Sequence, residues 1–207
     1  MSHLQFISRL KTKLSLPASR QGIHPPWRNI NYKKSINDIK GSINYRPAAV
    51  LILLFLKGQS IHFFLTKRTN NVDHHKGQIS LPGGARETGE TIQETALRET
   101  WEELGIDLGS DAIIGNLTPF NIPVSKFQIH PFIGWSNSLS EIHPDPQEVE
   151  KVFIPPLSSL LDDSNFFTET RHYNGTNYQA PYYVFPEGKV WGATAIILTE
   201  LKQIISG

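Results

Sequence analysis

The sequence predicts an α/β fold, in which strands lie before and after a central helix and a second helix closes the chain. Ala48 to Leu56 is an almost continuous apolar run, which is typical of a buried strand. Thr91, with Glu94 three residues later, forms a capping-box pattern, and Gly105 suits the left-handed position after a helix. The stretch between them contains neither Pro nor Gly, so we expect a helix there. Gly192 to Ile205 predicts the closing helix.

The first 45 residues predict an N-terminal extension, partly helical and partly irregular, ahead of one domain spanning residues 46–207. Apolar residues recur at helical spacing in residues 2–15, namely Leu4, Ile7, Leu10 and Leu14. We expect this amphipathic helix to pack on the domain, or on a second copy of the chain in a homodimer, rather than on a membrane. Residues 17–45 are rich in Pro, Asn, Lys and Gly, with room for one helical turn near residues 35–40.

Turn residues divide the rest of the chain into further elements. Lys57 to Ser60 is a hairpin signal, and residues 144–150 predict an acidic loop. A short helix is expected over residues 155–161. The expected strands are residues 61–67, 112–120, 127–135, 152–154, 166–172 and 178–185.

Three glutamates, Glu99, Glu102 and Glu103, gather on one arc of the central helix. Glu99 and Glu103 lie one turn apart and repel each other, and all three lie near the negative end of the helix dipole. A sequence selected for stability alone would avoid this arrangement, whereas a hard divalent cation bound by carboxylate oxygens requires it. A solvated acidic face is the alternative interpretation. Oxygen donors in a chain without Cys favour Mg²⁺ or Mn²⁺ over zinc.

Fixed spacings connect this helix to the Pro-Gly-Gly turn before it. Gly84 is followed after five residues by Glu90, and after seven more by Arg98-Glu99-x-x-Glu102-Glu103-x-Gly105-Ile106. This pattern resembles the Nudix box, the signature of hydrolases that cleave a diphosphate linked to another group. Its one departure is Thr100, at a packing position where the family usually has an aliphatic residue. The resemblance implies an α/β/α sandwich with a mixed sheet and a hydrolase that depends on Mg²⁺ or Mn²⁺.

The resemblance also implies roles for individual residues. Glu99, Glu102 and Glu103 would hold the metal ion, with the backbone carbonyl of Gly83 as an additional ligand. Arg98 would pair with Glu90 and fix the loop that contains Gly84 to the helix, so Gly84 and Glu90 are expected to border the binding site. A surface pair of Arg98 with Glu94 or Glu102 is the alternative.

Two further roles lie partly outside the box. Glu102 and Glu148 are both candidates for the general base. Arg68 ends a strand that leads to the site, and we expect it to bind a substrate phosphate. Trp191 is expected to belong to the core rather than to stack on a base.

Two flanking stretches are similar to motifs of the coenzyme A diphosphatase branch of this family. The first is Leu65-Thr66-Lys67-Arg68-Thr69, followed at matching spacing by Gly77 and Leu81-Pro82-Gly83-Gly84. The second is Trp191-Gly192-Ala193-Thr194-Ala195. Asp73 stands where the first motif has an Arg, and Thr69 and Leu81 replace Ser or Ala and Phe. Losing that Arg would weaken contact with a 3′-phosphate, because Asp offers no donors.

Composition narrows the partners. The chain has 20 Lys plus Arg against 19 Asp plus Glu, so no basic field points to nucleic acid. No apolar run reaches the length of a membrane span, and the lack of Cys excludes disulfides. We therefore expect a cytoplasmic protein whose partner is a small-molecule diphosphate.

The resemblance leads to one main hypothesis and two alternatives. The main one is metal-dependent hydrolysis of coenzyme A or a derivative to 4′-phosphopantetheine and adenosine 3′,5′-bisphosphate. The first alternative is a diphosphatase for ADP-ribose or another nucleoside diphosphate derivative. The second is a Nudix-fold sensor that binds a nucleotide without cleaving it, which the complete glutamate set argues against.

Overall fold

The computed structural model describes residues 2–16, 44–69, 77–122, 124–139, 141–173 and 176–207. Its helices are α1 (His3–Ser15), α3 (Ile92–Leu104), α4 (Leu157–Leu161) and α5 (Gly192–Ser206), with short 3₁₀ turns at Ser110–Ala112 and Asp163–Asn165. Its strands are β1 (Arg46–Lys57), β2 (Ser60–Phe63), β3 (Leu65–Arg68), β4 (Ile79–Ser80), β5 (Gly83–Ala85), β6 (Ile113–Asn116), β7 (Phe120–Ile122), β8 (Phe127–Ser136), β9 (Val149–Phe153), β10 (Phe166–Tyr173), β11 (Thr176–Phe185) and β12 (Gly188–Trp191). The helical turn expected near residues 35–40 and the loop position Asp73 lie outside the described residues.

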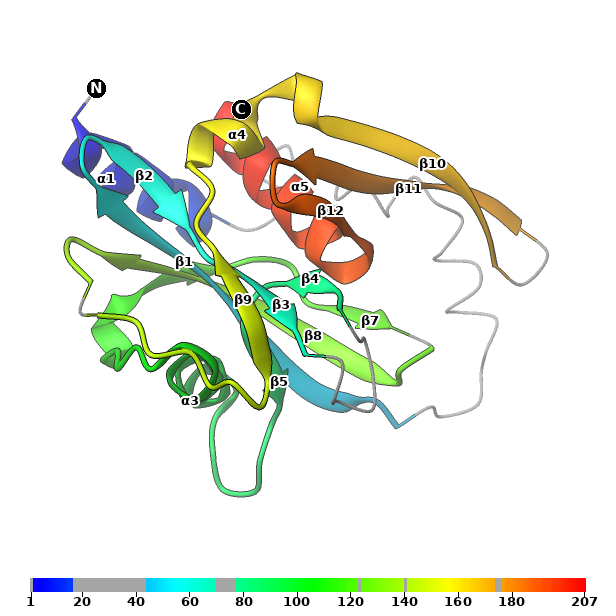
Figure 1. Ribbon diagram of the computed structural model, residues 1–207, viewed down its shortest axis with the longest axis horizontal. Coiled ribbons are helices and arrows are strands. Elements are labelled where there is room, and N and C mark those ends of the chain that lie inside the picture. Colours follow the sequence, from blue (N-terminus) through cyan, green and yellow to red (C-terminus); the bar gives the residue numbers. More distant parts are fainter. Residues whose placement is uncertain (1, 17–43, 70–76, 123, 140, 174–175) are drawn as a thin grey trace.

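The main sheet is mixed and has the order β2-β1-β8-β6, with β5 paired to β1 and β7 paired to β8. The long strands β1 and β8 are parallel, and their neighbours run antiparallel to them. Two smaller sheets, β4-β3-β9 and β10-β11-β12, complete the fold. Figure 1 shows α3 and α5 on opposite sides of the main sheet, which is the predicted α/β/α arrangement.

Alternate residues of β1 pack in the two hydrophobic clusters, one with residues of α3 and one with residues of α5. Leu51 and Leu53 belong to the cluster that contains Ala96 and Leu104 of α3. Their neighbours Ile52 and Leu54 belong to the larger cluster that contains the apolar face of α5. Because successive strand residues point to opposite faces, a strand covered on both sides is apolar throughout. This explains the continuous apolar run in the sequence.

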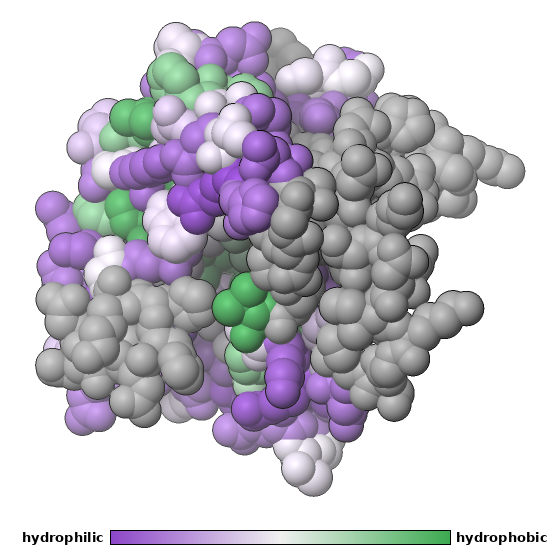
Figure 2. Space-filling view, turned by 90° about the vertical axis from the view of Figure 1, so that its right-hand side faces the viewer, coloured by the Kyte–Doolittle hydropathy of each residue, from purple (hydrophilic) through white to green (hydrophobic). Residues whose placement is uncertain are grey.

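The N-terminal helix α1 packs on the domain. Ser2 caps it together with Gln5, and Ile7, Leu10 and Leu14 are buried. Lys13 donates its ammonium to the carbonyl oxygen of Ile204 in α5 at 2.7 Å. No helix among the described residues is long and apolar enough to cross a membrane. On the face shown in Figure 2, the coloured surface is mainly hydrophilic and its apolar residues form small groups.

The structure divides two segments that the sequence predicts as single strands. Residues 61–67 separate at Phe64, so that β2 pairs with β1 while β3 joins β4 and β9. Residues 112–120 separate into β6 and β7, because the amide of Thr118 bonds to the carboxylate of Glu200 in α5 and Pro119 has no N–H.

Other differences concern strand limits. β9 begins at Val149, inside the segment expected to be a loop, and β12 follows β11 without a sequence prediction. No sequence prediction covers the short strands β4 and β5 either. The other helices and strands lie close to their predicted positions, including the closing helix.

Candidate active site

The central helix α3 begins and ends at the predicted residues. The Thr91 hydroxyl accepts a hydrogen bond from the Glu94 amide at 3.2 Å, and the Glu94 carboxylate accepts one from the Thr91 amide at 2.6 Å. Gly105 has a φ of 69°, and its N–H donates to the carbonyl oxygen of Trp101. A side chain at Gly105 would also collide with the backbone of His143. These caps fix the helix that presents the glutamates.

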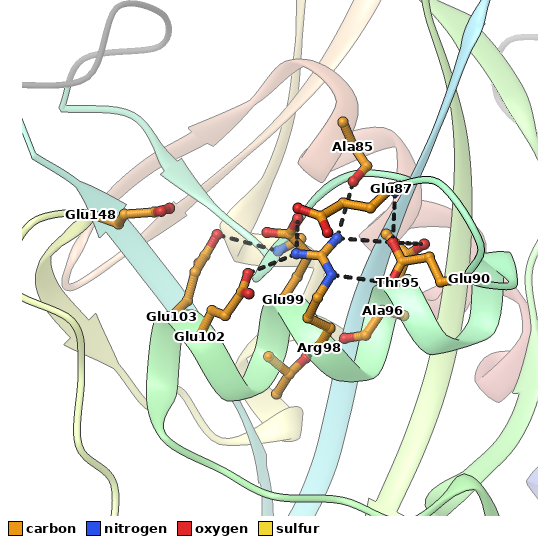
Figure 3. Close-up of polar contacts among 12 residues, drawn as sticks. Ala85, Glu87, Glu90, Thr95, Ala96, Arg98, Glu99, Glu102, Glu103 and Glu148 are labelled. Carbon is orange, nitrogen blue, oxygen red and sulfur yellow. Dashed lines mark hydrogen bonds and ion pairs between the residues drawn. The ribbon is translucent and has the colours of Figure 1, made fainter.

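Arg98 is the centre of the polar network on this helix (Figure 3). Its Nε and Nη2 donate to the two carboxylate oxygens of Glu90, each at 3.0 Å, and Nη2 also donates to the carbonyl oxygen of Ala85. Its Nη1 donates to Glu99 at 2.9 Å and to Glu102 at 2.7 Å. All five donors of the guanidinium are therefore used. The predicted pair with Glu90 is present, together with a bond to Glu102 that the sequence offered only as an alternative.

The carboxylate of Glu90 ties the loop after β5 to the helix. Besides Arg98, it accepts hydrogen bonds from the Glu87 amide and the Thr95 hydroxyl, both at 2.8 Å. The hydrogen bonds from Arg98 are the main reason that the pKa of Glu90 falls from 4.5 to about 2. Glu90 is therefore ionised at every physiological pH and acts as a permanent anchor.

Glu103 is the most deeply buried of the glutamates on α3, with 2% of its surface exposed. Its Oε2 accepts a hydrogen bond from the Thr66 hydroxyl at 3.2 Å, and its Oε1 accepts one from the Gly83 amide at 3.4 Å. The Arg68 guanidinium lies 3.7 Å from Oε1. Burial outweighs these favourable contacts and raises the pKa of Glu103 to about 7.

Glu99 lies one turn before Glu103 and is also largely shielded from solvent. Its pKa is raised, mainly by burial, and the negative charges of Glu102 and Glu148 add to the effect, while Arg98 opposes it. Gly84 gives this carboxylate its space, since a Cβ at that position would overlap all three carboxylate atoms of Glu99. A glycine at position 84 is thus a requirement of the site.

Glu148 reaches the site on the loop that connects β8 to β9 and passes the C-terminal end of α3. The amides of His143 and Asp145 donate to the carbonyl oxygens of Leu104 and Glu103, which holds the middle of the loop on the helix. At its end, the Thr69 amide donates to the carbonyl oxygen of Glu148 at 2.9 Å. The Glu148 side chain, about 43% exposed, lies 3.4 Å from the Arg68 guanidinium.

The turn at Gly83 brings the start of β5 close to these carboxylates. Gly83 has a φ of 154° and pairs with Val50 of β1. A Cβ on Gly83 would overlap the backbone of Ala49 and Val50. The backbone of Gly83 can therefore approach both β1 and Glu103, which no larger residue could do.

The carboxylates fit a hard cation in chemistry, although they do not form a complete shell of metal ligands. No three His, Cys, Asp or Glu side chains converge on one point within the described ranges. Glu99 and Glu102 turn to Arg98, whereas Glu103 turns to Thr66 and Gly83. The pKa values of Glu99 and Glu103 are nevertheless both raised, Gly84 leaves room for the carboxylate of Glu99, and a dication would neutralise the charge of both groups. The donor set suits Mg²⁺ or Mn²⁺.

The structure gives roles to two residues for which the sequence predicted none. Thr66 contacts Glu103 directly, and Thr69 holds the loop of Glu148. Both lie in the Leu-Thr-x-Arg-Thr stretch, so the sequence motif included these residues but did not indicate their roles. Trp191 differs from its prediction as a core residue, because 37% of its surface is exposed and the Arg171 guanidinium lies 4.7 Å above its ring.

Comparisons with known proteins agree with this architecture. Residues 45–173 match the family described as NUDIX domain. The chain is 34% identical over 186 residues to the mitochondrial Nudix hydrolase 15 of Arabidopsis thaliana, covering 84% of this chain and 65% of that protein. It is 32% identical over 163 residues to the Nudix hydrolase NudL of Photorhabdus laumondii, covering 78% of this chain and 86% of that protein.

A solved structure supports the fold alone. The MutT/nudix family protein from Enterococcus faecalis has a TM-score of 0.55 and 13% sequence identity, covering 99% of this chain and 73% of that one. The chain spans somewhat less than two thirds of the length of the Arabidopsis relative.

Proposed function

The chain belongs to the Nudix family, hydrolases that act on pyrophosphate bonds, and from this premise we propose that its substrate is coenzyme A or a derivative. Hydrolysis of the central diphosphate would give 4′-phosphopantetheine, or its acyl form, and adenosine 3′,5′-bisphosphate. The observation that carries the proposal is the position of Arg68. The motif similar to the coenzyme A diphosphatase branch runs along β3, and its Arg68 lies beside both Glu103 and Glu148.

Each residue of the site has a proposed task. Glu99 and Glu103, with Glu102 and the Gly83 carbonyl, would hold Mg²⁺ or Mn²⁺, which when bound neutralises phosphate charge and lowers the pKa of a water ligand. Arg98 keeps the loop and the helix together through Glu90.

Two side chains act on the substrate and the water. Arg68 would donate hydrogen bonds to a phosphate oxygen, for which its guanidinium is already directed into the site. Glu148 or Glu102 would take the proton from the attacking water, since both side chains remain partly exposed, at 43% and 42%.

One substitution favours a second candidate substrate. Asp73 replaces an Arg of the branch motif, and an acidic side chain there would not recognise a 3′-phosphate. ADP-ribose, which has no 3′-phosphate, is therefore the alternative.

Product analysis separates the two candidates. The full chain is incubated with Mg²⁺ or Mn²⁺ and either coenzyme A or ADP-ribose in ¹⁸O-labelled water, with Glu103→Gln as the inactive control. We expect kcat/KM to be higher for coenzyme A, with ¹⁸O in one of its two phosphate products identifying the phosphorus attacked. A higher kcat/KM for ADP-ribose would overturn the coenzyme A assignment and leave the family assignment unchanged.

A further inference from the structure

We propose that Thr66 is a positioning residue that orients the carboxylate of Glu103 for the metal ion. This inference rests on the proposed metal-dependent hydrolysis, although it does not depend on which diphosphate is the substrate. Thr66 is fully buried, and its hydroxyl donates to Oε2 of Glu103 across 37 positions of sequence.

The two oxygens of Glu103 have different partners. The Gly83 amide lies 3.4 Å and the Arg68 guanidinium 3.7 Å from Oε1. Among the described residues, the hydrogen bond to Oε2 comes from the Thr66 hydroxyl. Removing the Thr66 hydroxyl therefore leaves one oxygen of a buried carboxylate, Oε2, without a hydrogen bond. The carboxylate plane is then fixed on one side only.

The strand gives Thr66 the rigidity that positioning requires. β3 lies between β4 and β9, and Thr66 pairs with Ser80 on one side and with Val152 on the other. Because alternate strand residues share a face, Thr66 and Arg68 both point toward α3. One strand thus fixes the orientation of Glu103 through Thr66 and supplies the phosphate-binding guanidinium two residues later.

Residues that orient metal ligands typically change metal affinity or activity by about 10–100-fold when they are removed. We expect Thr66→Val, which replaces the hydroxyl with a methyl group, to weaken Mn²⁺ binding about tenfold. The effect should lie in kcat and in metal affinity, with KM for the diphosphate nearly unchanged.

The experiment compares Thr66→Val with Thr66→Ser and Thr100→Val. Serine keeps the hydroxyl and should restore Mn²⁺ binding. Thr100 is a matched control, since it is also fully buried, but its hydroxyl donates to the helix carbonyl of Ala96 instead of to a glutamate. Mn²⁺ binding is measured by electron paramagnetic resonance on the full chain without substrate, and thermal unfolding reports the fold of each variant.

Three results would overturn the proposal. The first is a Thr66→Val variant that binds Mn²⁺ as tightly as the unmodified chain. The second is a Thr66→Ser variant that loses as much affinity as Thr66→Val, which would assign the effect to the methyl group of Thr66. If Thr66→Val does not fold, Thr66→Ala takes its place in the same comparison. An unmodified chain that binds no Mn²⁺ would refute the metal proposal itself, and the role of Thr66 with it, whereas cleavage of a diphosphate other than coenzyme A would leave the role of Thr66 intact.

Discussion

Replacement of Glu90 by Gln should destabilise the fold in a way that depends on pH. In the unmodified chain the carboxylate accepts hydrogen bonds from the Glu87 amide, the Thr95 hydroxyl and two donors of Arg98. Gln offers one acceptor oxygen in place of two, and its amide N–H groups would face these donors. The variant therefore loses the ion pair and at least one hydrogen bond.

The pKa of Glu90 gives the magnitude. A fall from 4.5 to about 2 would correspond to roughly 3 kcal/mol if the whole effect appeared as stability. Solvent screening at the edge of the loop reduces this figure, so we expect a loss of about 2 kcal/mol at pH 7. Because the pKa is lower in the folded state, this stability is present above the unfolded pKa of 4.5 and disappears as the pH falls toward 2.

Urea unfolding at pH 7, 5, 4 and 3 measures the difference in the free energy of unfolding between Glu90→Gln and the unmodified chain. The difference should be largest at pH 7 and should shrink below pH 5. Glu87→Gln is the matched control, because Glu87 is exposed in the same loop and its hydrogen bond to Glu90 comes from its backbone. Equal stability at pH 7, or a difference that persists unchanged at pH 3, would refute the role assigned to the ion pair.

The remaining predictions concern the reaction and its metal. Glu103→Gln should lower kcat at least 10²-fold with Mg²⁺, while thermal unfolding at pH 8 shows unchanged or higher stability, because the variant removes a buried carboxyl with a pKa of about 7. In the unmodified chain, calorimetry should find that Mn²⁺ affinity falls about tenfold per unit below pH 7, because a proton then competes for Glu103. Gly84→Ala should lower kcat about 10²-fold, because its Cβ displaces the carboxylate of Glu99. Glu148→Gln and Glu102→Gln, compared by pH–rate profiles, should identify the general base as the residue whose loss removes the limb at low pH.

Each of these predictions would be contradicted by one specific result. Turnover retained after Glu103→Gln would contradict the metal assignment, and Mn²⁺ affinity that is constant from pH 5 to 8 would contradict the proton competition. Normal kcat in Gly84→Ala would show that Glu99 does not need its observed position. If both Gln variants keep the low-pH limb, neither Glu148 nor Glu102 is the base.

Tertiary contacts account for the predictions that failed. Residues 61–67 have the composition of one strand, and only pairing with β9 shows that the segment leaves the main sheet at Phe64. The break before β7 depends on Glu200, which lies 82 residues later in the sequence and bonds to Thr118. The exposure of Trp191 depends on the side of the β10-β11-β12 sheet that α5 covers, and the local sequence gives no sign of it.

The sequence by itself determined the limits of α3, the pairing of Arg98 with Glu90, the glycines of the turn and the membership of the Nudix family. These features depend on residues close together in the chain, where backbone conformation and helical spacing leave few alternatives. Only the tertiary structure decided that Thr66, Arg68 and the loop of Glu148 meet at Glu103. Their positions follow from the pairing of β3 with β9 and from the hydrogen bonds that join Thr66 and Asp145 to Glu103 of α3. Interactions between distant segments set that geometry, and no local pattern encodes it.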